Sequence, residues 1–131
     1  MVIPQPLISV NNVKISRQWY QETLGLESGH GGDEYERLMA HGNLVLQLHR
    51  WDVHDHPYLG SPAAGPNGHG VAIWFQTDEF DQAMARITAS KAEILEGPMI
   101  NQNAQHREVW LRDPDGYVVV VAGGYGDLGE R

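Results

Sequence analysis

The order of secondary-structure elements repeats along this chain of 131 residues, and that repeat constrains the fold most. A strand over 7–10 comes before a helix that starts after Asn12 and stops at Gly25. Two short strands follow that helix, near 34–41 and 43–50. The second half has the same order: a strand over 71–75, a helix capped by Asp78, and three further strands. Only the order of elements repeats, not the residues themselves. We therefore expect an α+β fold of two βαβββ modules.

A Pro- and Gly-rich stretch separates the two halves and predicts a linker or a lid. The chain is short enough for one domain with a core of its own. Its expected parts are module one over 1–50, the linker over 51–68, module two over 69–124 and a tail over 125–131. Within module two, the residues over 97–105 read as a polar loop, and Asp113-Pro114-Asp115-Gly116 reads as a type I turn.

Charge and composition narrow the classes of function. The net charge of −8 and the lack of a basic stripe exclude a typical nucleic-acid binder. No apolar run is long enough to cross a membrane, the N-terminal residues do not resemble a secretory leader, and there are no cysteines. We expect a cytoplasmic protein with no nucleic-acid or membrane partner.

Side chains alternate between the two faces of a strand, so each predicted strand offers two sets of residues. One set is uniformly large and apolar and is expected to pack under the helices and build the core: Ile8, Val10, Leu46, Leu48, Val71, Ile73, Phe75, Val109, Leu111, Val119 and Val121. The opposite set mixes apolar and polar side chains, as the lining of a small-molecule cavity does. The alternative is that this second face meets solvent. Val118, Val120, Trp74 and Trp110 favour the cavity, because they are too apolar for an open face.

Four segments resemble the vicinal oxygen chelate superfamily, which includes glyoxalase I, extradiol dioxygenases and the bleomycin and fosfomycin resistance proteins. They are SRQWYQETLGL (16–26), GNLVLQLHRWD (42–52), HGVAIWFQTDEFDQA (69–83) and WLRDPDGYVVV (110–120). The resemblance implies curled mixed sheets around a cavity, with the helices on the outer face. It also implies a homodimer, as in the resistance-protein branch, with cavities formed between modules of both subunits.

The same resemblance implies a divalent metal held by His and Glu side chains from four strands. Alignment by the motifs puts those positions at Gln5, Gln47, Gly70 and Val120. Two amides and two residues without a donor side chain do not supply the imidazole and carboxylate ligands that such a metal needs. His69 would supply a ligand if a bulge turned it inward, although a simple register shift would turn Val71 to the wrong face. We expect no cofactor, with a divalent metal on Gln5, Gln47 and His69 as the alternative.

The expected ligand cavity collects the residues of the mixed face: Gln5, Gln47, His49, Trp74, Glu108, Trp110, Arg112 and Val120. His49, His106, Glu108 and Arg112 could cluster there, either for acid–base chemistry or as polar lining of a binding cavity. If the protein is an enzyme without a metal, the candidate catalytic residues are His49 and Glu108. The tract His54-Asp55-His56 reads as a solvated loop rather than a metal tract. Trp19 is expected in the core. Trp51 begins the linker, and two positions stay open for it: closed over the cavity or away from it.

Three functions follow from these observations. The first is a small-molecule-binding protein without the metal, which sequesters an aromatic or cationic antibiotic-like compound between indoles and a carboxylate. The second is a metal-dependent lyase or dioxygenase with an unusual ligand set. The third is an enzyme without a metal that uses His49 and Glu108.

Overall fold

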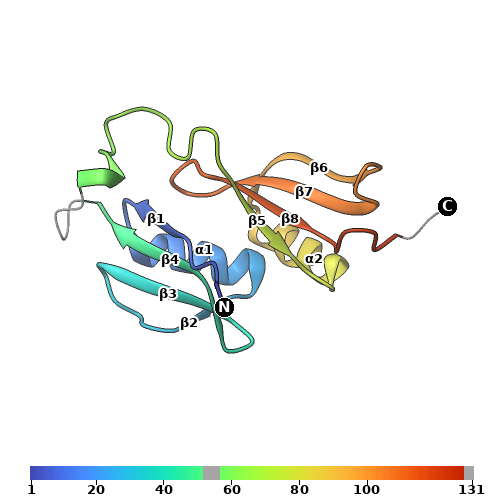
Figure 1. Ribbon diagram of the computed structural model, residues 1–131, viewed down its shortest axis with the longest axis horizontal. Helices are drawn as coiled ribbons and strands as arrows, with labels where there is room; N and C mark the ends of the chain where they lie inside the picture. The colour runs from blue at the N-terminus through green and yellow to red at the C-terminus, as the bar shows by residue number, and fades with distance from the viewer. Residues whose placement is uncertain (52–56, 129–131) are drawn as a thin grey trace. The chain divides into compact units, whose positions relative to one another are not determined.

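The computed structural model describes residues 1–51 and 57–128. The chain divides into two compact units, Met1–Asn67 (unit 1) and Gly68–Arg131 (unit 2). The tract His54-Asp55-His56 lies outside the described residues. Among the described residues, each unit holds one mixed four-stranded sheet and one α-helix, and Figure 1 labels these elements.

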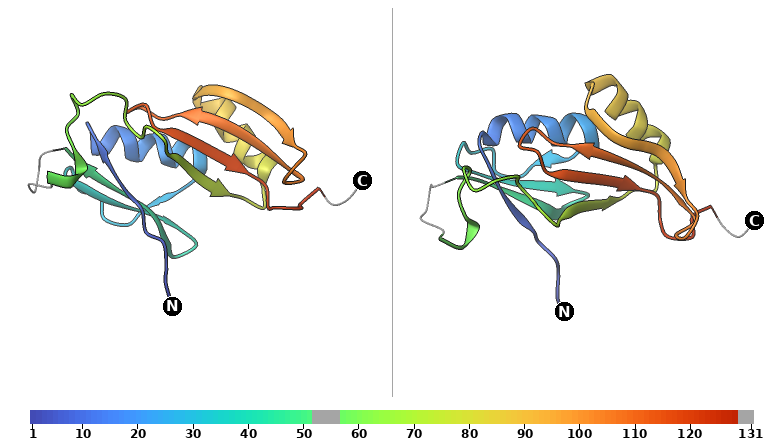
Figure 2. Two further views of the ribbon diagram at one scale, coloured as in Figure 1. Left: turned by 45° about the horizontal axis from the view of Figure 1, so that its top comes forward. Right: turned by 90° about the horizontal axis from the view of Figure 1, so that it is seen from above.

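Unit 1 contains β1 (Leu7–Val10), α1 (Val13–Leu24), β2 (Glu27–Ser28), β3 (Tyr35–Ala40), β4 (Asn43–Arg50) and a short 3₁₀ turn, η1 (Pro57–Leu59). Its sheet has the order β1-β4-β3-β2, with β1 parallel to β4 and the remaining pairs antiparallel. Helix α1 contacts β3 and β4 and covers one face of this sheet (Figure 2).

Unit 2 contains β5 (Ala72–Gln76), α2 (Phe80–Ser90), β6 (Glu93–Asn101), β7 (His106–Arg112) and β8 (Val118–Ala122). Its sheet has the order β5-β8-β7-β6, with β5 parallel to β8. The two units therefore have the same element order and the same strand order, which confirms the α+β class and the two βαβββ-like modules. Within the described residues, neither α1 nor α2 has the length and apolar character of a membrane-spanning helix.

Helix α1 begins and ends where its capping residues place it. The side chain of Asn12 accepts a hydrogen bond from the Ile15 N–H at 3.0 Å, and Gly25 closes the helix in the left-handed region at φ 68°. The buried stripe consists of Val13, Ser16, Tyr20 and Thr23. Ile15, expected on that stripe, is 53% exposed, because it lies roughly a third of a turn from the centre of the stripe. Trp19 is half-buried and packs edge-to-face on Tyr20, with ring centroids 4.8 Å apart.

Helix α2 buries Phe80, Ala83 and Ile87. Its N-cap is Glu79 rather than the expected Asp78, and the Glu79 side chain makes no capping hydrogen bond. The helix ends at Lys91, which takes the left-handed conformation at φ 58° that Gly25 takes after α1.

The apolar strand face lies in the core as predicted, except that Phe75 is only half-buried and Val71 is exposed. Its central members on β4, β7 and β8 are fully buried or nearly so. Val71 is 56% exposed, because it precedes the first residue of β5. A turn follows β7 at the expected place, closed by the Gly116 N–H on the Asp113 carbonyl at 3.0 Å. The Asp113 carboxylate also accepts hydrogen bonds from the backbone N–H groups of Asp115 and Tyr117, both at 2.9 Å.

Strand β6 extends further than expected and reaches into the segment assigned to a polar loop. Gly97 and Pro98, which fall within the expected loop over 97–105, lie inside the strand. The pairing of β6 with β7 shifts register on both sides of Glu96. An edge strand tolerates such a break, because one side of its backbone has no neighbour within the sheet. The extra length brings Asn101 opposite His106.

Candidate functional site

The mixed strand face of unit 2 carries a compact aromatic and polar cluster. We call Trp74, Asn101, His106, Glu108 and Trp110 the Trp–Glu cluster. Trp74 on β5 and Trp110 on β7 both pair with Val120 on β8, so the two indoles flank the middle strand. Their ring centroids are 6.1 Å apart and their planes are perpendicular. Trp74 remains 47% exposed, whereas Val120 is fully buried.

Glu108 is the centre of the cluster and is only 2% exposed. Its Oε1 accepts a hydrogen bond from the Asn101 amide at 2.9 Å and lies 2.8 Å from His106 Nε2. Its Oε2 accepts a hydrogen bond from the Trp110 indole N–H. Three side chains from β6 and β7 thus bind one buried carboxylate, and the indole of Trp110 is fixed by one of these bonds.

Burial by itself would raise the pKa of Glu108, because it disfavours the charged form. The hydrogen bonds from Trp110, Asn101 and His106 outweigh burial and hold the pKa of this carboxyl below its ordinary value. Glu108 is therefore ionised at neutral pH and accepts hydrogen bonds without donating any.

The remaining cavity residue of unit 2, Arg112, lies at the end of β7. Its guanidinium donates to the Gly116 carbonyl at 3.0 Å and lies 3.5 Å from the Glu93 carboxylate. Arg112 is thereby held at the turn and at the sheet edge, away from the hydrogen bonds of Glu108.

In unit 1, Gln47 is held by hydrogen bonds on both sides of its amide. The Tyr35 hydroxyl donates to Gln47 Oε1, and Gln47 Nε2 donates to the Gln5 carbonyl at 2.9 Å. These contacts join β3, β4 and the segment before β1. Gln47 thus contacts the main chain of Gln5, whereas the expected cavity involved the Gln5 side chain.

His49 follows on β4 and is 5% exposed. Its Nδ1 lies 2.8 Å from the Arg50 carbonyl, which fixes the proton on Nδ1 in the neutral ring, since a carbonyl only accepts. The expected pairing of His49 with Glu108 spans the two units. Within unit 2, the imidazole that contacts Glu108 is His106, one of the residues expected to be able to cluster with Glu108. Strand β7 begins at His106 rather than at the expected residue 108.

The residues at the family's metal positions do not fit a metal. Gly70 precedes β5, and the first residue of that strand is Ala72, so neither offers a donor. Val120 is apolar, and the Gln47 oxygen already accepts the Tyr35 hydroxyl. His69 is exposed in a turn closed by the Val71 N–H on the Gly68 carbonyl. Among residues 1–51 and 57–128, no three His, Asp or Glu side chains group as a metal site would require.

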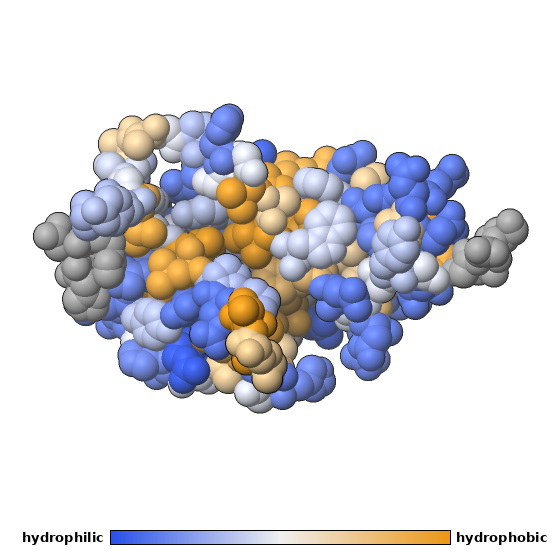
Figure 3. All heavy atoms as spheres, viewed as in Figure 1, coloured by the Kyte–Doolittle hydropathy of each residue, from blue (hydrophilic) through white to orange (hydrophobic). Residues whose placement is uncertain are grey.

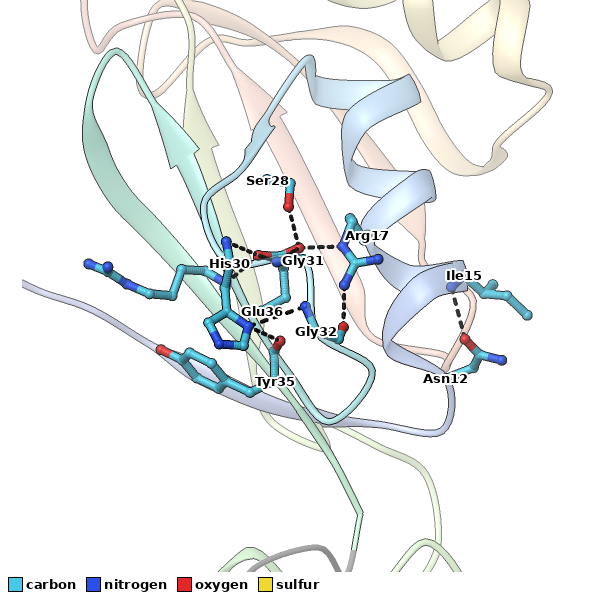
Figure 4. A network of polar contacts seen from close by, with 10 residues as sticks. Asn12, Ile15, Arg17, Ser28, His30, Gly31, Gly32, Tyr35 and Glu36 are labelled. Carbon is cyan, nitrogen blue, oxygen red and sulfur yellow. Dashed lines mark hydrogen bonds and ion pairs between the residues drawn. The ribbon is translucent and has the colours of Figure 1, made fainter.

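A second buried carboxylate, Glu36 on β3, was missed by the sequence analysis. It is fully buried on the helix side of the unit 1 sheet, because it pairs with Leu48. Arg17 from α1 and the Ser28 hydroxyl bind its Oε2, and the backbone N–H groups of His30 and Gly31 bind Oε1 (Figure 4). The glycine-rich loop around residues 29–32 is the only sequence signal for this network, since it supplies the backbone donors.

Burial acts to raise the pKa of Glu36, but the hydrogen bonds from Ser28, Gly31, Arg17 and His30 overcome it and lower the pKa from 4.5 to about 2. Glu36 therefore ties α1, the edge strand β2 and the glycine-rich loop to β3. It serves stability, because its oxygens are enclosed by these donors.

Each unit also has a shallow surface hollow. One, of about 590 Å³, is lined by His30, Gly32, Asp33, Glu34 and Tyr35, and another, of about 340 Å³, lies between Phe80, Met84, Met99 and Arg107. On the face of the molecule shown in Figure 3, apolar side chains lie among polar ones. Neither hollow gathers buried polar groups as the Trp–Glu cluster does, so the cluster is the stronger candidate site.

Comparison with known proteins identifies the family. Residues 2–121 match the model of the Glyoxalase/Bleomycin resistance protein/Dioxygenase superfamily, so the chain belongs to this superfamily. No curated protein sequence matches the chain.

Solved structures share the fold at low identity. A protein from the mobile metagenome of V. Pseudocholerae is 20% identical with a TM-score of 0.71, over 94% of each chain. TioX from Micromonospora sp. ML1 is 16% identical with a TM-score of 0.71, over 94% of this chain and 98% of that one. The fosfomycin resistance protein FosX from Listeria monocytogenes is 17% identical with a TM-score of 0.68, over 100% of this chain and 95% of that one.

The Glu36 network makes a prediction about stability and pH. The pKa of Glu36 is lower in the folded chain than in the unfolded chain. Ionised Glu36 therefore contributes its full stabilisation to the free energy of unfolding above pH 4.5, and this stabilisation is lost as the pH falls toward 2. Glu36→Gln should cost roughly 2–3 kcal/mol of unfolding free energy at pH 7 and flatten the acid limb of the stability curve, as measured by urea denaturation between pH 3 and 7.

Glu34→Gln is the matched control, since the Glu34 side chain is 53% exposed and lies 3.6 Å from Arg50. Equal losses in the two variants would contradict the assignment. If Glu36→Gln does not fold, an NMR titration of the Glu36 carboxyl in the wild-type protein tests the assignment instead. A titration midpoint above pH 4 would contradict the lowered pKa of Glu36.

Proposed function

We propose that this protein binds a planar aromatic small molecule on the Trp–Glu cluster, without the metal of its superfamily. The observation that carries the proposal is the perpendicular indole pair of Trp74 and Trp110 at 6.1 Å, with Trp74 half exposed above a buried strand. A flat ligand that stacks on one indole would meet the edge of the other, which is the arrangement that aromatic rings prefer.

The cluster is preorganised for such a ligand. The Trp110 indole is held by its bond to Glu108, and Glu108 is held in turn by Asn101 and His106. A fixed aromatic surface loses little side-chain entropy on binding, so more of the stacking energy contributes to affinity.

The charge of the ligand is a secondary feature of the proposal. A net charge of −8 and an ionised Glu108 favour a cation through space. The Glu108 oxygens already accept three hydrogen bonds from side chains of the cluster. These bonds occupy the carboxylate and disfavour its direct contact with a cationic group of the ligand. We therefore place aromatic stacking first and positive charge second.

Antibiotic-like compounds are the ligand class that the relatives support. The superfamily is named in part for bleomycin resistance proteins, and one similar structure is a fosfomycin resistance protein. Binding and sequestration need no metal, and the donors at the family's metal positions do not suit one. The homodimer expected from the resemblance is part of this proposal and stays a prediction.

The metal-free part of the proposal predicts low metal content. Protein purified without chelator should carry far less than one equivalent of Zn, Ni, Mn or Fe by elemental analysis. Adding these ions should leave the melting temperature unchanged, since a ligand that binds only the native state stabilises it. Stoichiometric metal that disappears in Gln5→Ala, Gln47→Ala or His69→Ala would contradict the proposal and favour a metal-dependent lyase or dioxygenase.

The stacking part predicts which tryptophans matter for affinity. Calorimetric titration with a panel of neutral and cationic planar aromatics should find binders, and Trp74→Ala or Trp110→Ala should weaken their binding several-fold or more. Loss of one aromatic pair costs about 0.5–1.5 kcal/mol beyond the lost area.

Trp19→Phe is the control, because Trp19 packs on Tyr20 in unit 1. The stacking proposal is wrong if no panel member binds, or if Trp19→Phe weakens binding more than both cluster variants.

A further inference from the structure

His106 has one ring nitrogen engaged and one without a partner. Its Nε2 lies 2.8 Å from Glu108 Oε1, and the residue is 95% buried, being 5% exposed. Its Nδ1 is buried and has no hydrogen-bond partner among the described residues. Buried polar atoms are usually paired, so an unpaired nitrogen at the centre of a candidate site calls for an explanation.

The contact with Glu108 determines which nitrogen carries the proton. An ionised carboxylate can only accept, so the proton between the two groups belongs to His106 Nε2. In the neutral ring, Nδ1 then presents a lone pair and acts as an acceptor. With the ring neutral, the unmatched Nδ1 is an acceptor that requires a donor.

The position of the ring places this acceptor next to the stacking surface. The His106 ring centroid lies 5.9 Å from that of Trp74, with a tilt of 53° between the planes. Trp74 is the half-exposed neighbour of this ring, so a ligand that stacks on the fixed Trp110 and moves the Trp74 indole aside reaches the imidazole.

Resting on the proposed function, we infer that the ligand of the Trp–Glu cluster carries a hydroxyl or N–H group that donates to His106 Nδ1. The ligand class is thus narrowed from planar aromatics to those with a donor on the ring system, such as a phenolic hydroxyl or a pyrrole-type N–H. Sites that present a buried acceptor reject analogues that lack the donor, because the acceptor is then left unpaired.

A pair of probes that differ only in the donor tests this inference. 2-Naphthol and 2-methoxynaphthalene offer the same ring system, and only the first has a hydroxyl hydrogen. By calorimetry the wild-type protein should bind 2-naphthol roughly three- to ten-fold more tightly than 2-methoxynaphthalene, as expected for one net hydrogen bond.

His106→Gln is the informative variant. The Gln amide nitrogen can occupy the position of Nε2 and donate to Glu108, but the variant has no counterpart of Nδ1. Its preference for 2-naphthol over 2-methoxynaphthalene should fall to about one-fold, and this ratio within the variant is the readout, because the substitution can change the affinity for both probes alike.

The outcomes separate the two proposals. If the wild type binds neither probe, and no other member of the aromatic panel, the proposed function fails. If it binds both equally, or if His106→Gln keeps the full preference, only the donor inference is overturned. If the variant does not fold, long-range ¹H–¹⁵N spectra of the wild-type protein test the inference instead. They should show a proton on His106 Nε2, and the Nδ1 signal should shift with 2-naphthol but not with 2-methoxynaphthalene. A proton on Nδ1 in place of Nε2 would overturn the inference.

Discussion

A buried carboxylate must be supplied with donors by the chain around it, and this constraint organises both units of the protein. Glu36 on β3 and Glu108 on β7 occupy equivalent strands of the two βαβββ modules, and both are almost completely buried. In each case hydrogen bonds outweigh the cost of burial and keep the carboxylate ionised. An ionised group of this kind fixes the positions of all its donors at once.

The two carboxylates differ in the face of the sheet on which they lie, and this difference separates stability from function. Glu36 lies on the helix side, where Arg17 and the backbone of the glycine-rich loop enclose it. Glu108 lies on the opposite side of its sheet, where its donors include an imidazole and an indole. The first network holds a helix and a loop to the sheet, and the second presents aromatic groups at a surface.

Much of the fold could be predicted from the sequence, because it depends on local signals. These signals are the alternation of side chains between the two faces of each strand and the residues that end the helices. The same alternation placed Trp74, Glu108, Trp110 and Val120 on one face. The sequence offered His106 as a neighbour of Glu108, but it did not predict the hydrogen bond from Asn101. That bond depends on β6 continuing through Gly97 and Pro98, which read as a loop. The burial of Glu36 could not be predicted either. Its backbone donors come from a loop, and the spacing of residues along the sequence does not predict the path of that loop. Membership of the superfamily followed from motifs spread over most of the chain.

The central claim is that the perpendicular indoles of unit 2 form the binding surface for an aromatic ligand. Indole N–H signals in a ¹H–¹⁵N NMR spectrum report on each of the four tryptophans separately, once single Trp→Phe variants have assigned them. On titration with 2-naphthol, the account predicts saturable shifts of the Trp74 and Trp110 signals, with the Trp19 signal unmoved. Saturable shifts at Trp19 with none at Trp74 and Trp110, or no shift at any tryptophan up to the solubility limit, would contradict it.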